Sequence, residues 1–349
     1  MARPKQHHYV TRAYLEGFLR PSEQHLVCYG RGRNRWPFKK SPEDLASQRN
    51  YYALKKKDGT WDDSIERLLD ETVETPGLPL IRKLASGKTA LCWDERQRIS
   101  LLIAIQEMRT PAARERVKAM SKLINERVFH DVKEADPNQN TIDLVGESGK
   151  HTTVSFDEMA STHEDMCDDH SMDIHRPLVS SALKLAKYYQ HMKFTVYYPS
   201  GDTEFLTTDT PVIRVFHNMQ AAPFGAGIHR KDLEIRFPLS RGAFLTLTHD
   251  AWLITKLERA RHAADRSRLL AVLPEIRTKQ AASHEVTAFN KGQARHAHRW
   301  VFTPGEVNWA ASLLAQHSAA PRVVDLSNRD LMHFQSEVNY DPKMDSAVE

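Results

Sequence analysis

Lys5-Gln6-His7-His8-Tyr9-Val10 opens the chain, and Tyr14-Leu15 and Phe18 follow at roughly helical spacing. This spacing predicts a short helix over residues 11–19 that lays its apolar side on a core. The two histidines then lie beside an anchored segment. Imidazole titrates near neutral pH, exchanges protons and binds metal ions, so His7 and His8 are candidate site residues. Adjacent side chains diverge, and we expect one histidine to be structural and one to face a cleft. The alternative is that both only cap the first helix.

Most of the predicted helices lie before about residue 192, and β-rich sequence follows. Helices are predicted over about 61–73, 93–129 and 172–191, with a division at Pro111, because proline lacks the amide donor. Segments such as 194–198, 212–215 and 243–247 alternate and are β-branched or aromatic, which favours strands. Shorter predictions are a hairpin of 26–29 with 36–38, a strand over 51–54, a helix near 276–294 and a strand over 300–302. The fold class is therefore α+β, with a helical N-terminal half and a mostly antiparallel C-terminal sheet.

The domain prediction is one large domain over residues 1–340. Its helical part covers about 1–192 and its β-rich part about 193–302. Residues 134–170 are polar and rich in turn residues, so we expect a mobile insertion there, and residues 341–349 are expected to be a disordered tail.

Composition excludes several classes of protein. The chain has 349 residues, 40% hydrophobic and 27% charged, as in ordinary soluble globular proteins. No apolar run approaches the ~20 residues of a membrane span, and no signal peptide is visible, so a cytoplasmic protein without membrane contact is expected. The three cysteines are far apart and form no CxxC pair. Neither a disulfide framework nor a thiolate zinc site is predicted.

Positive charge gathers at the N-terminal end of the chain. Residues 1–60 hold 13 Lys and Arg against five Asp and Glu. Within them, Arg31, Arg33 and Arg35 alternate with Gly32 and Asn34 and precede Trp36. Arginines beside an aromatic ring suit contacts with phosphates and stacked bases. Two hypotheses are open for this segment: a contact with nucleic acid, and a solvated hairpin tip.

Gln106 and Arg109 continue the apolar stripe of the longest predicted helix. A buried glutamine must be hydrogen-bonded, and a buried arginine must be paired or bind an anion. Arg109 and Arg116, two turns apart, are candidates for a phosphate clamp; the alternative is an Arg–carboxylate pair that locks the helix before Pro111. Glu66 and Glu74 are ~12 Å apart on adjacent faces of one helix, so they cannot share a metal ion. Glu74 can instead reach an arginine and Glu66 a histidine; the alternative is that both are solvated surface residues.

Asp209 lies in the polar segment Thr207-Thr208-Asp209-Thr210-Pro211 between two apolar strands. A turn role for its carboxylate is slightly favoured. A carboxylate flanked by hydroxyls at a strand end is also a common acid, base or metal ligand. Thr208 and Asn290 are further candidates for binding or orienting a substrate; the alternative for Asn290 is that it caps a strand. His163, His170 and His175 lie among acidic residues without a zinc-type spacing and are interpreted as part of a solvated loop.

These motifs together resemble the bacterial family called domain of unknown function 4238. Its members begin with Lys-x-His-His-Tyr-Val-Pro and continue with Tyr-Leu-x-x-Phe, as residues 5–18 nearly do. Further matching segments follow in the family's order: 65–66, 73–74, 106–111, 207–212, 237–240 and 289–290. Thr11 replaces the family's usual proline, and Thr208 replaces its usual serine but keeps the hydroxyl. The resemblance spans residues 5 to about 302 and implies an architecture and a set of site residues, but no activity.

Two functional hypotheses from different classes remain open. The first is a nuclease-like or nucleotide-directed enzyme, in bacterial antiviral defence, with His7 or His8 as general acid or base. Arg109 would clamp the anion, and Asp209 would be a base, metal ligand or orienting group. Tyr9, Gln106, Arg116, Thr208, Asn290 and the three tip arginines would bind substrate. A divalent metal cofactor is compatible with this hypothesis. The second is a non-catalytic sensor or adaptor that binds nucleic acid or a phage component. Protein partners are not predicted.

Overall fold

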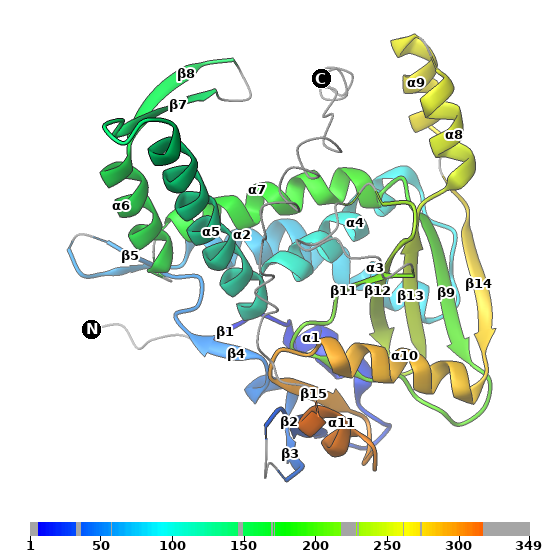
Figure 1. The fold of residues 1–349 in the computed structure, drawn as a ribbon. Helices are drawn as coiled ribbons and strands as arrows, with labels where there is room; N and C mark the ends of the chain where they lie inside the picture. The colour runs from blue at the N-terminus through cyan, green and yellow to red at the C-terminus, as the bar shows by residue number, and fades with distance from the viewer. Residues whose placement is uncertain are drawn as a thin grey trace.

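The computed structural model describes residues 6–32, 36–56, 58–145, 149–168, 170, 172–217, 228, 230–260, 262–272 and 274–316. The α+β class is confirmed: long helices occupy the first half, and a mostly antiparallel sheet dominates the second (Figure 1). Strands also occur in the first half, and helices follow the sheet. No helix in the described ranges has both the length and the apolar character that a membrane crossing requires.

The largest sheet has five strands in the order β11-β12-β13-β9-β14. They are β11 (Ile213–Phe216), β12 (Leu233–Ser240), β13 (Ala243–Thr248), β9 (Lys193–Pro199) and β14 (Ile276–Ala281). All neighbours are antiparallel except β14, which runs parallel to β9. The helix predicted near 276–294 is therefore wrong in its first third. Strand β14 is polar and mostly exposed at the sheet edge, so it lacks the apolar alternation that marks a strand in sequence.

Helices cover both faces of this sheet. Val196 and Leu245 are paired across β9 and β13 and point into the main core with α3 (Thr75–Ala85), α4 (Trp93–Met108) and α7 (Met172–Tyr189). Tyr197 and Phe244 point to the opposite face, where they pack with Phe289 of α10 (Ser283–His296). The two-residue side-chain period of strands thus produces a helix–sheet–helix layering.

A second sheet joins the two ends of the described chain. Its order is β10-β15-β2-β3, from β10 (Thr207–Thr208), β15 (Trp300–Thr303), β2 (Leu26–Gly30) and β3 (Phe38–Lys40). The predicted β2–β3 hairpin is confirmed, and its tip, residues 33–35, lies outside the described residues. Helix α11 (Ala310–Gln316) packs with α10 against β2 and β15.

The N-terminal segment lies inside the molecule. Strand β1 (Gln6–His8) pairs with β4 (Ser47–Arg49), and α1 (Arg12–Leu15) continues as a 3₁₀ turn over Glu16–Phe18. Tyr14 of α1 donates to the carbonyl oxygen of Pro238 at 2.7 Å and stacks on Phe237, so this segment is fixed to β12. A second 3₁₀ turn covers Pro42–Asp44.

The strand predicted over 51–54 is wrong for its first three residues. Asn50 has a φ of 55°, and the chain turns there, so Tyr51 and Tyr52 are buried in a turn. Their aromatic pattern reflects this burial and not a strand. Only Leu54–Lys55 (β5) forms a strand, paired with β6 (Trp61–Asp62).

The remaining helices extend the first half. Helix α2 (Ser64–Leu69) continues through a π-helical turn, Asp70–Glu74, into α3, so the helix predicted to end at about residue 73 runs on past Pro76 and Pro79. Pro76 fits because the first turn of α3 needs no amide donor there. Helix α5 (Pro111–Ala135) begins at the predicted division.

Residues 134–170 contain regular structure. A hairpin of β7 (Thr141–Val145) and β8 (His151–Ser155) precedes α6 (Phe156–Cys167), which a Ser155–Glu158 capping box starts. Helix α6 packs on α5, at one side of the molecule in Figure 1. Helices α8 (Ala251–Arg259) and α9 (Ala263–Leu270) extend above the five-stranded sheet (Figure 1). The tail predicted to be disordered, 341–349, lies outside the described residues.

Candidate functional site

Arg109 joins the N-terminal segment to the helices. It follows the last residue of α4, and its Nε donates to the carbonyl oxygen of Tyr9 at 2.9 Å. Its two other nitrogens bond Thr11 Oγ1, at 2.7 Å, and the carboxylate of Glu74. Gln106, one turn earlier, donates to the same Tyr9 carbonyl at 3.0 Å. The alternative prediction of an Arg–carboxylate pair before Pro111 is thus confirmed. We call these five residues the Arg109 cluster.

His7 is fully buried in β1, and both its ring nitrogens face protein groups. Nδ1 accepts the backbone N–H of Tyr52 at 3.0 Å. Nε2 lies 3.1 Å from Glu66 Oε2 and 3.8 Å from Asp63 Oδ1. Because Nδ1 is an acceptor, a neutral ring carries its proton on Nε2, toward Glu66. The expected Glu66–histidine contact is present. His7 therefore connects β1 to α2, and both of its ring nitrogens face protein groups instead of a substrate.

His8 points the other way, as adjacent strand residues do. Its ring is half-buried, and Nε2 lies 2.9 Å from the carbonyl oxygen of Glu43. The groups found against the two imidazole rings, Glu43, Tyr52, Asp63 and Glu66, lie in the segment 43–66. The structure thus places the histidine pair with this segment, and the carboxylate of Asp209 with the segment before β15.

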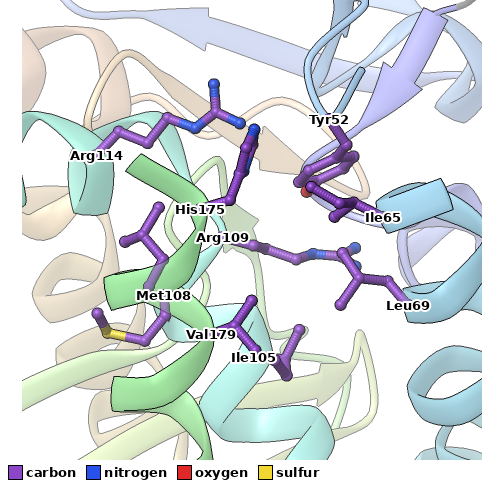
Figure 2. A pocket seen from close by; sticks show the side chains of 10 residues that line it. Tyr52, Ile65, Leu69, Ile105, Met108, Arg109, Arg114, His175 and Val179 are labelled. Carbon is purple, nitrogen blue, oxygen red and sulfur yellow. The ribbon is translucent and has the colours of Figure 1, made fainter. Parts of the chain in front are cut away.

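A small pocket lies beside the Arg109 cluster, and Figure 2 shows the side chains that line it. Four of them are polar: Tyr52, Arg109, Arg114 and His175. The others are apolar: Ile65, Leu69, Ile105, Met108, Leu178 and Val179. The cavity volume is about 20 Å³, which admits one occupant of water size. A nucleotide does not fit there.

Arg114, and not Arg116, shares this pocket with Arg109. The predicted Arg109–Arg116 clamp assumed one continuous helix, but α4 ends at Met108 and α5 starts at Pro111, which changes the helical phase. Arg116 is exposed. Arg114 donates to the Tyr51 carbonyl at 2.5 Å and lies over the Tyr51 ring, 3.5 Å from its centroid.

Asp209 holds the segment that precedes β15. Its Oδ1 accepts the backbone N–H of His298 at 2.9 Å, and its Oδ2 accepts those of Arg299 and Trp300 at 2.7 and 3.1 Å. Burial raises the pKa of Asp209 to about 7, and the three N–H donors limit the rise. Both carboxylate oxygens are thus used inside the protein. The turn bond expected of Asp209 is made by Thr208, whose hydroxyl accepts the Thr210 N–H at 3.1 Å.

Arg31 and Asn290 hold the same region. Arg31 is buried, and its guanidinium donates to the carbonyl oxygens of Ala294, Arg295 and Ala297 at 2.8–3.1 Å. It therefore caps the C-terminal end of α10, where a cation is favoured, and does not face a phosphate as predicted. Arg33 and Arg35 lie outside the described residues. Asn290 accepts from Leu206 N at 3.0 Å and donates to the Glu204 carbonyl at 2.9 Å, which matches its alternative role as a strand cap.

The segment held by Asp209 presents three residues that sequence reasoning missed. His298 Nε2 lies 3.4 Å from Glu115 Oε1, Arg299 is exposed, and Trp300 contacts the ring of Phe38 edge-on at 5.5 Å. Burial lowers the pKa of His298, Glu115 opposes this, and the charges of three arginines, including Arg299, lower it further. The available signal was a basic and aromatic triplet whose last residue, Trp300, begins a predicted strand.

Potential metal ligands are dispersed in the described part of the chain. His163 in α6 contacts Ser121, His170 contacts the Ala53 carbonyl, and His175 is buried in α7 at the small pocket. The prediction that the three belong to a solvated loop is therefore wrong for His163 and His175. Within the described ranges, one trio of His, Asp or Glu brings its ligand atoms together: His130, Asp131 and Glu134, exposed on α5. Asp131 in this trio is also paired with Arg127. None of the three was a predicted site residue.

Asp209→Asn tests the structural role of this carboxylate. The amide turns one acceptor into a donor that faces backbone N–H groups, so the free energy of unfolding should fall by about 2–3 kcal/mol. Urea denaturation measures it. Thr208→Ser, which keeps the adjacent hydroxyl and loses one buried methyl group, is the matched control and should cost only about 1 kcal/mol. Equal stability of Asp209→Asn and wild type would return Asp209 to the list of catalytic candidates.

The comparisons with known proteins identify a family. No curated protein and no solved structure matches the chain significantly. The model of the family described as "Protein of unknown function (DUF4238)" matches residues 6–304. The match includes His7, the Arg109 cluster, Asp209 and the segment Asp209 holds. This chain therefore belongs to the DUF4238 family.

Proposed function

We propose that this protein binds single-stranded nucleic acid on the surface formed by β3 and the segment before β15. We call this surface the Trp36 platform; its members are Trp36, Phe38, Lys39, Lys40, Arg299 and Trp300. One observation carries the proposal: Trp36 is 86% exposed, more than any other large apolar side chain in the described part of the chain. Contiguous exposed apolar surface marks binding sites, and Trp36 lies two residues before the exposed Phe38, whose ring contacts Trp300.

The platform has the chemistry that a single strand requires. Phe38 is partly exposed and contacts Trp300, so aromatic rings follow one another from β3 to β15. Lys39 and Lys40 are exposed on the same edge strand, and Arg299 is exposed beside Trp300. Bases stack on aromatic faces, while lysine and arginine attract the phosphates. Asp209 and Arg31 support this surface from inside by fixing the backbone that carries it.

The predicted catalytic groups are engaged by other groups of the protein, and this favours binding over hydrolysis. Both ring nitrogens of His7 face Tyr52 and Glu66, and both oxygens of Asp209 accept backbone N–H groups. A general acid or base needs an atom within hydrogen-bond reach of the substrate. The contacts of His7 and Asp209 hold the fold together, which fits a non-catalytic adaptor.

Substitutions on the platform test the proposal. Trp36→Ala should weaken binding of a fluorescent oligonucleotide by about 5- to 150-fold, since stacking contributes about 1–3 kcal/mol per base. Lys39→Gln with Lys40→Gln should make the slope of log Kd against log salt shallower by about 1.4. Fluorescence anisotropy at several salt concentrations measures both.

Matched controls lie elsewhere on the surface. Arg277→Gln with Lys279→Gln removes two charges from the exposed edge strand β14, and Trp61→Ala removes a less exposed tryptophan. Both controls should bind like wild type. If the β14 variant weakens binding as much as the β3 variant, the contact is non-specific. If wild type binds no oligonucleotide, the proposal fails.

A second candidate, phosphodiester hydrolysis on the same platform, is favoured by His298. Its lowered pKa keeps the imidazole neutral, and Glu115 lies 3.4 Å from Nε2, so a base and its orienting carboxylate are adjacent. His298→Gln should then abolish cleavage of mixed RNA and DNA substrates, with or without magnesium, manganese or zinc, and leave anisotropy binding unchanged. Absence of cleavage by wild type would remove this candidate and leave the binding proposal intact.

A further inference from the structure

A polar cavity of about 440 Å³ lies where the loop after β9 meets the turn between β12 and β13. Its volume is in the range of protein cavities that hold small molecules. It shares no lining residue with the small pocket beside the Arg109 cluster or with the Trp36 platform. Four of its lining residues are charged: Arg20, Asp202, Glu204 and Arg241.

One carboxylate orients both arginines of this cavity. Arg20 Nε and Nη2 lie 2.8 and 2.7 Å from Glu204 Oε2, and Arg241 Nη1 donates to Glu204 Oε1 at 2.9 Å. Each guanidinium carries five N–H donors. Within the described ranges, Arg20 Nη1 and the Nε and Nη2 atoms of Arg241 make no hydrogen bond and no ion pair. One negative charge thus serves two positive charges, and several N–H donors stay available to a ligand.

The Arg20 guanidinium is held from a second side by the backbone after β15. A Cβ atom built on Gly305 would lie 2.7 Å from Cζ, Nη1 and Nη2 of Arg20, so the planar group rests against this glycine. Glycine allows such a close approach because it has no side chain. Glu204 and Gly305 together position the guanidinium, and this lowers the entropy cost of binding a ligand.

Asp202 brings a free negative charge to the same cavity. The residue is exposed, and in the part of the chain that the structure describes its carboxylate makes no hydrogen bond and no ion pair. The cavity therefore offers free N–H donors together with a free carboxylate. Arginine donors match a carboxylate group, and an aspartate matches an ammonium group. A ligand with both groups satisfies the cavity, whereas a simple anion would face Asp202 unpaired.

We propose that this cavity binds a zwitterion of amino-acid size, with its carboxylate on Arg20 and Arg241 and its ammonium group on Asp202. The probe is L-glutamine, whose side chain is uncharged. Two blocked compounds separate the ends of the probe: N-acetyl-L-glutamine lacks the ammonium group, and L-glutamine amide lacks the carboxylate. The site is independent of the proposed nucleic-acid binding, because no residue is shared with the Trp36 platform.

NMR titration of the full chain locates the site. In wild type, L-glutamine should shift the backbone amide signals of Gly201 and Gly242, which line the cavity, in a saturable manner. Each blocked compound should bind about tenfold more weakly or worse, because one charge-assisted contact is lost. The proposal is overturned if L-glutamine gives no saturable shift at these two glycines. It is also overturned if N-acetyl-L-glutamine binds wild type as tightly as L-glutamine, which would make the cavity a site for anions.

Variants test the two ends of the ligand separately. Gly305→Ala displaces the flexible end of Arg20 and should weaken L-glutamine binding about fivefold or more. Asp202→Asn should make L-glutamine and N-acetyl-L-glutamine bind equally, because the charge that selects the ammonium group is gone. Arg98→Gln, which removes an exposed arginine paired with Asp94 on α4, is the control and should bind like wild type. Equal L-glutamine affinity of Gly305→Ala and wild type would also overturn the proposal.

Discussion

The packing of the N-terminal segment depends on the backbone carbonyl oxygen of Tyr9. Arg109 and Gln106 both donate to it from the end of α4. It lies between β1 and α1, so one oxygen fixes the strand that carries His7 and the helix that carries Tyr14. Arg109 is held in turn by Glu74, next to α3. Removing one buried partner would leave a charge or a carbonyl unsatisfied, which costs far more than the net gain from one bond.

The other segments that match the family also make polar contacts between distant parts of the chain. Tyr14 fixes the N-terminal helix to the sheet through Pro238 and Thr207. Asp209 and Arg31 then fix the residues between α10 and β15. Each motif contacts another that is distant in sequence, so together they connect the helical half with the β-rich half. Polar residues are used at these contacts because the partners are backbone groups at strand and helix ends, which must be satisfied when buried.

Sequence reasoning was sound where local periodicity decides the outcome. The long helices, the strands 194–198 and 243–247 and the buried state of Gln106 and Arg109 follow from apolar spacing. It failed where tertiary pairing decides: β14 is polar, and the turn at Tyr51 and Tyr52 has the composition of a strand. For Glu66 and Glu74, sequence reasoning named the residue type of the partner, a histidine and an arginine. It did not give the structural role of these contacts, because whether a histidine faces a substrate depends on which groups contact its two ring nitrogens. The pairing of Arg109 with Arg114 depended on a change of helical phase at Pro111 that spacing alone does not give.

Hydrogen exchange of Arg109→Lys tests most directly whether the Arg109 cluster fixes the N-terminal segment. Lysine keeps the charge opposite Glu74 but cannot bond Tyr9 and Thr11 at the same time. Amides of residues 7–18 and of Tyr52 should exchange faster than in wild type, and the free energy of unfolding should fall by about 2–4 kcal/mol. Arg98→Lys, exposed on the same helix, should change neither. Unchanged protection of residues 7–18 in Arg109→Lys would contradict the account and make the cluster a site kept for its chemistry.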